Sequence, residues 1–232
     1  MSDKFHDSVV GEIIVRRHQW SRGVSIKYSV RGELIATAPK HVPLMFIKRV
    51  IRSKRSEIAD IKKRGDTPHY ISGQIIGKSH RLEIIVSPKS TAPALNTKQR
   101  VLYLTLAEAN DINKPDVQLL VQKEVIKVHR REAKAYLSRR LSLLAERHNY
   151  SYSRMRFTHA GTRWGSCSSS GTISLNIALM KLPLELIDYV LIHELCHTLQ
   201  MNHSTGFWSL VEKADPQYSH HRKLLKTYSP SL

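Results

Sequence analysis

Two histidines and one glutamate in a short segment have the types and spacing of a metal site. The segment spans residues 193–197 and reads HELCH, and histidines four residues apart project from the same face of a helix. Catalytic zinc sites have three protein ligands and one open position, and neutral imidazole nitrogen suits this metal. Glu194 lies about 100° around the helix from His193, beside the ligands, where it can take a proton from a metal-bound water. His203 follows His197 by six residues and is the predicted third ligand.

The surroundings of HELCH favour a metal site over a chance match. A pentapeptide of this kind arises by chance, but here His193 and Glu194 interrupt an otherwise apolar, periodic stretch. Asn202 could end the helix and turn the chain back towards the metal. We therefore expect His193, His197 and His203 to bind Zn²⁺ and Glu194 to act as the general base. The alternative is that these are surface histidines or capped core histidines.

The elements that must position these residues can be predicted from hydrophobic periodicity. Pro183 fits the first turn of a helix that carries the motif and runs to about residue 199. A long helix is predicted over residues 117–148 and a shorter one over residues 206–213. Residues 155–158 and 172–177 are predicted strands around a connection rich in Gly and Ser.

The first half of the chain has the alternation of strands. Residues 12–16, 24–30 and 34–37 predict an antiparallel meander, and residues 43–64 predict a helix with a heavily basic outer face. Three further strands are predicted over residues 70–76, 81–86 and 101–106. The sequence shows no evident internal repeat.

These elements predict an α+β fold. An N-terminal antiparallel β region with one basic helix, residues 1–114, would pack on a helical and β metal-binding domain, residues 115–232. The pattern changes near Pro115 from strand-like alternation to helical periodicity, and this change fixes the predicted boundary.

The charge of the chain is its one extreme property. The 232 residues include 37 Lys and Arg against 19 Asp and Glu, which gives a net charge of +18. Such a field attracts polyanions, so nucleic acid or a nucleotide is an expected partner. The alternative is that the excess only keeps the protein soluble.

Other features of the composition point to the cytoplasm. The chain has two cysteines, too few for a disulfide scaffold. It shows no secretory signal and no apolar run of about 18 residues. We expect a cytoplasmic protein with no membrane partner.

Several motifs together resemble the YgjP-like metallopeptidase family, most densely over residues 154–225. The motifs are TRWGSCS at residues 162–168, GTISLN at 171–176, YVLIHELCH at 189–197, NHS at 202–204, and Phe207-Trp208. The resemblance implies a zincin-like core similar to that of SprT-type metalloproteases. It also implies that the HExxH histidines and a downstream histidine are the metal ligands. One departure is the absence of a Trp near residues 52–58.

Further residues around the motif have two interpretations each. Arg163 could bind an anionic or carbonyl oxygen near the metal, or it could only fix a loop, which we favour. Cys167 and Cys196 could be ligands, but we expect small buried side chains. Three residues after the last predicted helix could reach the cleft and stabilise an oxyanion: Tyr218, His220 and His221.

The leading hypothesis is zinc-dependent hydrolysis of a protein or peptide with Glu194 as general base. The first alternative is a metal-dependent nucleotide phosphohydrolase, because a metal-bound hydroxide can attack a phosphoryl group as well. The second is a nucleic-acid-binding protein in which zinc is structural. A protease that acts on DNA-bound proteins would combine the peptidase hypothesis with nucleic-acid binding.

Overall fold

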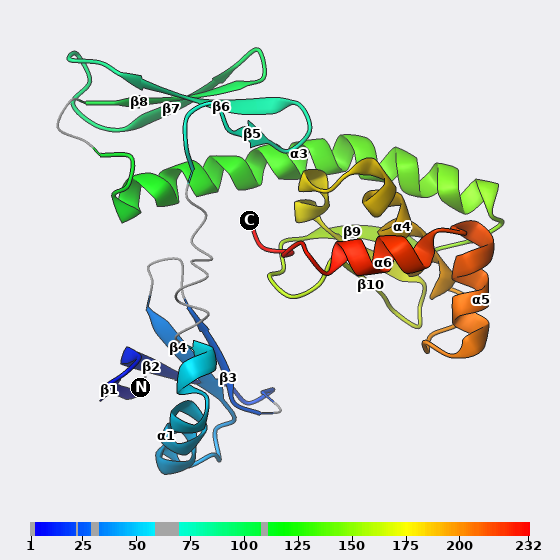
Figure 1. Cartoon of the computed structure of the whole chain (residues 1–232), viewed down its shortest axis with the longest axis horizontal. Coiled ribbons are helices and arrows are strands. Elements are labelled where there is room, and N and C mark those ends of the chain that lie inside the picture. The colour runs from blue at the N-terminus through cyan, green and yellow to red at the C-terminus, as the bar shows by residue number, and fades with distance from the viewer. Residues whose placement is uncertain (1–2, 22, 29–32, 59–69, 108–110) are drawn as a thin grey trace. The chain divides into compact units, whose positions relative to one another are not determined.

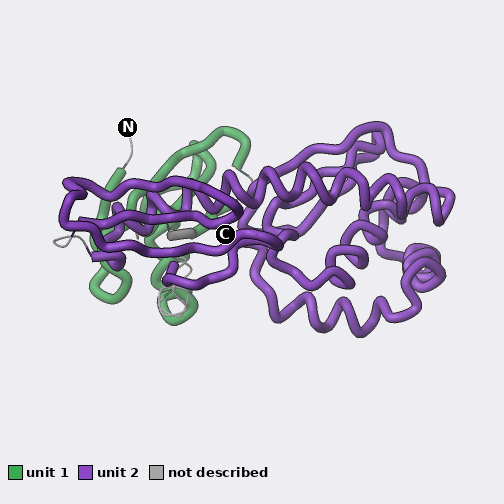
Figure 2. Tube along the Cα trace, turned by 90° about the horizontal axis from the view of Figure 1, so that it is seen from above, with its two compact units in different colours: residues 1–69 green, residues 70–232 purple. Residues whose placement is uncertain are grey.

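The computed structural model of the chain has a mixed α+β fold with several small sheets (Figure 1). It describes residues 3–21, 23–28, 33–58, 70–107 and 111–232. Two compact units divide the chain, residues 1–69 and residues 70–232 (Figure 2). This division lies well before the boundary at residues 114 and 115 that the sequence predicts. Each unit is described by itself below.

The sheet of the first unit is mixed, which corrects the predicted antiparallel meander. Its strands are β1 (Asp3–Asp7), β2 (Gly11–Arg17), β3 (Ser25–Tyr28) and β4 (Leu34–Ala38). They lie in the order β1-β2-β4-β3, with β4 parallel to β2 and antiparallel to β3. Leu34, Ile35 and Ala36 are all buried. A continuous apolar run is typical of a strand covered on both faces, which explains the central position of β4.

The helical residues that follow β4 pack against this sheet. The helix α1 (Leu44–Ser53) buries Ile47 and Ile51 in the core of the unit. A turn at Lys54 ends it, but residues 55–58 are helical again, and Ile58 is buried in the same core. Residues 59–64 of the predicted helix lie outside the described residues. The predicted basic outer face is present, since Arg49 and Arg52 are exposed.

The second unit begins with a sheet of the same topology. Its strands are β5 (Ile75–Ile76), β6 (His80–Val86), β7 (Ala94–Lys98) and β8 (Val101–Leu106). Their order is β5-β6-β8-β7, with only the central pair parallel. Both sheets therefore follow one pattern of strand order and pairing, although the sequence shows no evident internal repeat.

The long helix α3 (Pro115–Arg147) contributes to two cores of the second unit. Its 33 residues span about 50 Å. The first half packs on the inner face of the β5–β8 sheet through Val117, Val121, Val125 and Val128. The second half enters a different core through Leu137, Leu141 and Leu144. The helix thus links the β5–β8 sheet to the core that contains the HELCH segment.

The remaining elements form the core around the HELCH segment. A three-stranded sheet has the order β10-β11-β9, made of β9 (Arg154–Thr158), β10 (Gly165–Cys167) and β11 (Thr172–Asn176). After it come the 3-10 helix η1 (Ile177–Lys181) and the helices α4 (Leu184–Cys196), α5 (Thr205–Ala214) and α6 (Tyr218–Leu225). The sequence predicts α3, α4 and α5 correctly within a few residues but misses β10, η1 and α6.

None of the helices in the described ranges combines the length and the apolar character that spanning a membrane requires.

Candidate metal centre

The helix α4 positions the first two histidines of the site. From Leu186 onward its apolar residues are buried around the whole circumference, so the helix is fixed in the core and can orient a polar side chain rigidly. His193 and His197 lie one turn apart, and their Nε2 atoms are 3.2 Å from each other. Two nitrogen atoms this close, in a buried helix, require either a shared proton or a shared cation.

The third histidine comes from the loop that follows α4. The Nε2 atom of His203 lies 3.2 Å from Nε2 of His193. Oδ1 of Asn202 accepts hydrogen bonds from the backbone N–H of Ser204 and from Nε2 of Gln200. Asn202 therefore holds the loop and does not end the helix, which stops at Cys196. One ligand atom from each of the three histidines lies within 4.8 Å of the others, so the group could hold a metal ion.

The hydrogen bonds of the rings define which nitrogen faces the cluster. Nδ1 of His197 lies 3.0 Å from the carbonyl oxygen of Gln200, so Nδ1 donates and Nε2 keeps a lone pair. Metal-binding histidines have partners of this kind, which fix the tautomer. Burial, followed by His197, His203 and Arg222, lowers the pKa of His193 to about 3, so this ring is neutral and able to donate a lone pair.

Glu194 lies beside the histidines in a dry environment. Its side chain is 5% exposed, and Oε2 has no hydrogen-bond partner among the described residues. Burial raises the pKa of Glu194 to about 8, against the opposing effect of Arg163. A buried carboxyl oxygen without a partner is costly, and such groups mark functional sites more often than structural ones.

A layer of aromatic rings supports the three imidazoles. The Phe207 ring stacks on His197 with 4.4 Å between centroids and meets His193 edge-on at 4.9 Å. The Trp208 ring stacks on His203 at 5.6 Å. Both aromatic residues come from α5 and leave the imidazoles little freedom to rotate. The motif NHS..FW at residues 202–208 contains both aromatic residues. Its spacing alone does not predict that their rings pack against the histidines.

The helix α6 carries Tyr218, His220 and His221, the three residues that could stabilise an oxyanion. His221 is buried and its Nδ1 lies 2.7 Å from Oδ2 of Asp215. Tyr218 stacks on Trp208 at 5.6 Å, and His220 is exposed. Arg222 lies over the Trp208 ring, 4.4 Å from its centroid. No feature of the sequence singles out Arg222 or Asp215.

Asn176, Arg163 and the two cysteines lie near the motif and have different environments. Asn176 is fully buried and donates from Nδ2 to the carbonyl oxygens of Ala160, Arg163 and Pro230. It therefore shapes the loop before β10. The backbone of Arg163 is tied by this bond, while its exposed guanidinium acts on Glu194 by charge alone. Cys196 is buried, and its Sγ donates a hydrogen bond to the hydroxyl group of Tyr150. Neither cysteine belongs to the histidine cluster.

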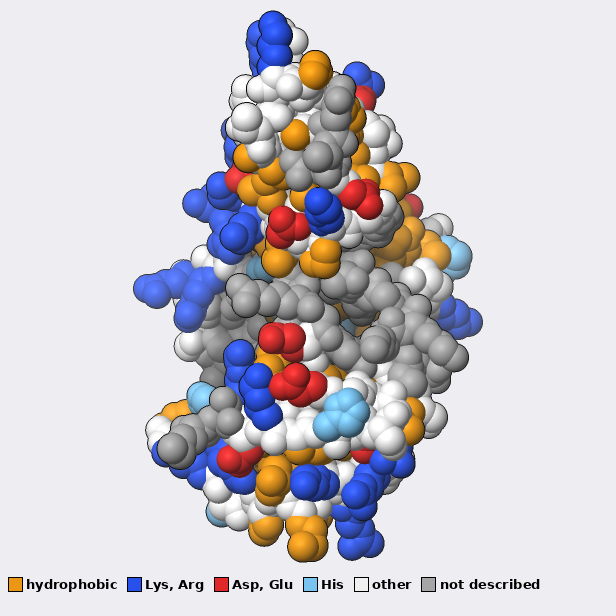
Figure 3. All heavy atoms as spheres, turned by 90° about the vertical axis from the view of Figure 1, so that its left-hand side faces the viewer, with side chains coloured by type: hydrophobic (Ala, Val, Ile, Leu, Met, Phe, Trp, Pro, Cys, Tyr) orange, Lys and Arg blue, Asp and Glu red, His pale blue; other side chains and the backbone are white. Residues whose placement is uncertain are grey.

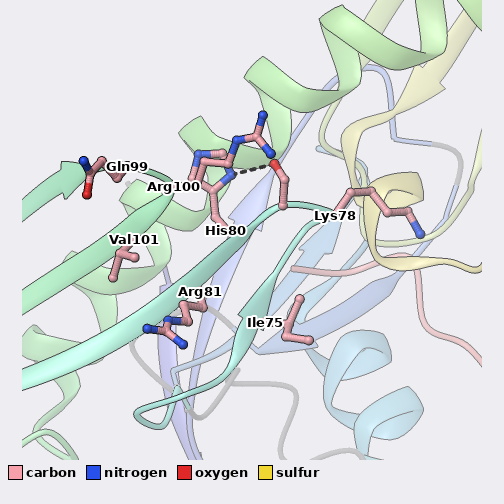
Figure 4. Close-up of a pocket in the computed structure, with 8 residues that line it drawn as sticks. Ile75, Lys78, His80, Arg81, Gln99, Arg100 and Val101 are labelled. Carbon is pink, nitrogen blue, oxygen red and sulfur yellow. Dashed lines mark hydrogen bonds between the residues drawn. The ribbon is translucent and has the colours of Figure 1, made fainter.

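A separate basic pocket exists on the β5–β8 sheet (Figure 4). Its lining residues are Ile75, Lys78, Ser79, His80, Arg81, Gln99, Arg100 and Val101. Lys78 donates to the carbonyl oxygen of Leu182, His80 bonds Glu132, and Arg81 pairs with Glu83. The pocket contains none of the predicted site residues. Lys and Arg side chains also recur over much of the face in Figure 3, in keeping with the charge of +18.

One comparison with known proteins identifies the family of the chain. The family model described as YgjP-like, metallopeptidase domain, matches residues 22–228. The chain therefore belongs to the YgjP-like metallopeptidase family, as the motifs suggested. No curated protein matches the chain. Among solved structures, it is similar to the metallopeptidase zymogen of Pyrococcus abyssi abylysin, with 27% identity over 39% of this chain and 92% of that chain, and a TM-score of 0.36.

Proposed function

We propose that this protein is a zinc-dependent peptidase in which His193, His197 and His203 bind the zinc ion and Glu194 is the general base. The observation that carries the proposal is the convergence of three histidine Nε2 atoms beside a buried carboxylate that lacks a partner. The family match supplies the peptidase class.

The spacing of the nitrogens suits zinc. A tetrahedral ion with Zn–N bonds of about 2.0–2.1 Å would hold its nitrogen ligands about 3.3–3.4 Å apart. The two shortest Nε2 pairs, His193 with His197 and His193 with His203, are both at 3.2 Å. Structural zinc sites have four protein ligands, whereas this cluster has three among the described residues. This favours a catalytic site over a structural one.

The residues of the chain then have defined tasks. A bound zinc ion would polarise the scissile carbonyl and make a water nucleophilic near neutral pH. Oε2 of Glu194 takes the proton of the attacking water and passes it to the leaving amine. The raised pKa of Glu194, about 8 without a metal, suits a group that must both accept and return a proton, and a nearby cation would lower it.

The strand β10 provides a reason for a peptide substrate. One edge of β10 pairs with β11, and its other edge pairs with no strand in the described part of the chain. Gly165 of this strand lies directly against Glu194. An extended peptide can add to a free strand edge through backbone hydrogen bonds. Such a peptide would bring its carbonyl groups next to Glu194. A nucleotide cannot pair with a strand edge in this way.

The experiment compares the zinc-loaded wild type with Glu194→Gln on an unfolded protein substrate and on a panel of nucleoside triphosphates. We expect about one zinc per chain in both proteins, cleavage of the protein substrate by the wild type, and loss of cleavage in the variant. Release of phosphate with no proteolysis would favour the nucleotide phosphohydrolase. Zinc binding with neither activity would refute the catalytic role.

A further inference from the structure

An arginine without an acidic partner lies next to the histidine cluster. Arg222 is exposed on α6, and its guanidinium carbon is 4.4 Å from the centroid of the Trp208 ring. Within the described ranges, no carboxylate forms an ion pair with it, and Asp215 nearby is already bonded to His221. A guanidinium that stacks on an aromatic ring keeps the N–H groups of its rim available.

Trp208 connects this arginine to the proposed metal ligands. Its ring stacks on His203 with 5.6 Å between centroids and lies 5.9 Å from the ring of His193. Tyr218 also stacks on Trp208, at 5.6 Å, so the platform that holds the guanidinium is itself fixed. The positive charge is therefore held one ring away from the cluster and on a rigid support.

We propose that Arg222, held on Trp208, forms a carboxylate-binding subsite that selects peptides with an acidic group near the scissile bond. This inference rests on the proposed peptidase function. The planar fork of arginine binds a carboxylate through two parallel hydrogen bonds, and a strongly basic chain attracts acidic peptides from a distance. The carboxylate belongs either to an Asp or Glu side chain or to the C-terminus of the peptide.

A second cation near the site provides the competing explanation. Arg163 lowers the pKa of Glu194, so its charge acts on the carboxylate itself. A substrate carboxylate drawn to Arg163 would compete with Glu194 for the same charge. Arg222 has no such competitor in the described residues, and this favours Arg222 as the subsite.

The test measures peptide binding by calorimetry to zinc-loaded Glu194→Gln protein, in which substrate is not consumed. The probes are acetylated, amidated peptides in which one Glu is scanned along a neutral sequence, each with a Gln counterpart. A second set leaves the C-terminal carboxylate free. We expect the best Glu peptide or free carboxylate peptide to bind about tenfold more tightly than its neutral counterpart, and the set that shows this identifies the source.

Variants assign the preference to a residue. In the Glu194→Gln protein, the additional substitution Arg222→Gln should abolish the preference for acidic peptides. The substitution Arg222→Glu should instead produce a preference for peptides with Lys. The control Lys223→Gln removes an exposed charge from the same helix and should leave the preference intact. Each variant must bind zinc and unfold at the temperature of the parent, which excludes misfolding.

The subsite would be overturned by equal binding of acidic and neutral peptides, by a preference that survives Arg222→Gln, or by loss of the preference with Arg163→Gln instead. Tight binding of nucleoside triphosphates through Arg222, with no acidic peptide bound, would also overturn it. Hydrolysis of the same peptides by the wild type is measured in parallel. If no peptide is cleaved, the peptidase proposal fails, while the binding data still decide the subsite.

Discussion

Gly165 on the strand β10 and Glu194 on the helix α4 are in such close contact that a Cβ atom at position 165 would require the Glu194 side chain to move. A Cβ atom on Gly165 would lie 2.6 Å from Oε1 of Glu194 and 2.9 Å from its carboxyl carbon. The backbone of β10 therefore reaches the side of the proposed general base directly. This contact makes Gly165 a sensitive position for the function, although it is neither a ligand nor a base.

Gly165→Ala should displace the Glu194 carboxylate and leave the fold and the zinc content unchanged. Misplacing a catalytic group by about 1 Å costs about 100-fold in rate, so kcat on a peptide substrate should fall by about this factor. Gly161→Ala is the matched control, because a Cβ there meets nothing within 4 Å. Full activity in Gly165→Ala would show that the position of Glu194 does not limit the reaction.

His203→Ala should weaken zinc binding far more than substitution of a nearby histidine outside the cluster does. The variant removes one of three converging nitrogens, so the loss should exceed the about 10- to 100-fold loss caused by removing a supporting hydrogen bond. Competition with a chromophoric chelator measures the affinity. His220→Ala serves as the control, since His220 is exposed and outside the cluster. Equal zinc affinity in the two variants would remove His203 from the ligand set.

Glu132 should stabilise the second unit in a pH-dependent way. Its carboxylate accepts hydrogen bonds from the backbone N–H groups of Lys78 and Ser79 and bonds the His80 ring at 2.7 Å. Burial raises the pKa of Glu132, but these hydrogen bonds outweigh it and hold the pKa below its ordinary value. A lowered pKa means that the stabilisation is present above the unfolded value, about 4.3, and is lost as the pH falls through the folded value.

Glu132→Gln should therefore lower the free energy of unfolding by about 2 kcal/mol at pH 7, and the difference from the wild type should shrink on acidification. Urea denaturation at a series of pH values measures both effects. Glu124→Gln on the same helix is the control, because its pair with Lys127 is solvated and contributes at most about 0.5 kcal/mol. A difference that does not change with pH would contradict the role of the Glu132 charge.

The sequence predicts the parts of this site that depend on local spacing. His193 and His197, the latter at the C-cap of α4, follow from an i, i+4 pair in an apolar helix, and His203 follows closely in the chain. The position of β4 between β2 and β3 does not follow, because strand pairing depends on contacts distant in sequence.

The elements that pack around the histidines could not be predicted from local sequence patterns either. The strand β10 consists of Gly165, Ser166 and Cys167, which have little strand propensity. The helix α6 is mostly polar, with His221 as its one buried residue, so it lacks an apolar stripe. Periodicity therefore missed both elements, and with them Gly165 and Arg222, whose importance appears only when the elements are packed together.

The most direct test of the central claim is an anomalous difference map from crystals of the zinc-loaded protein, collected at the zinc absorption edge. The account predicts one peak per chain about 2.0–2.1 Å from the Nε2 atoms of His193, His197 and His203, with no other protein ligand. A peak bound by a cysteine or a fourth side chain, or no peak at the three histidines, would contradict it.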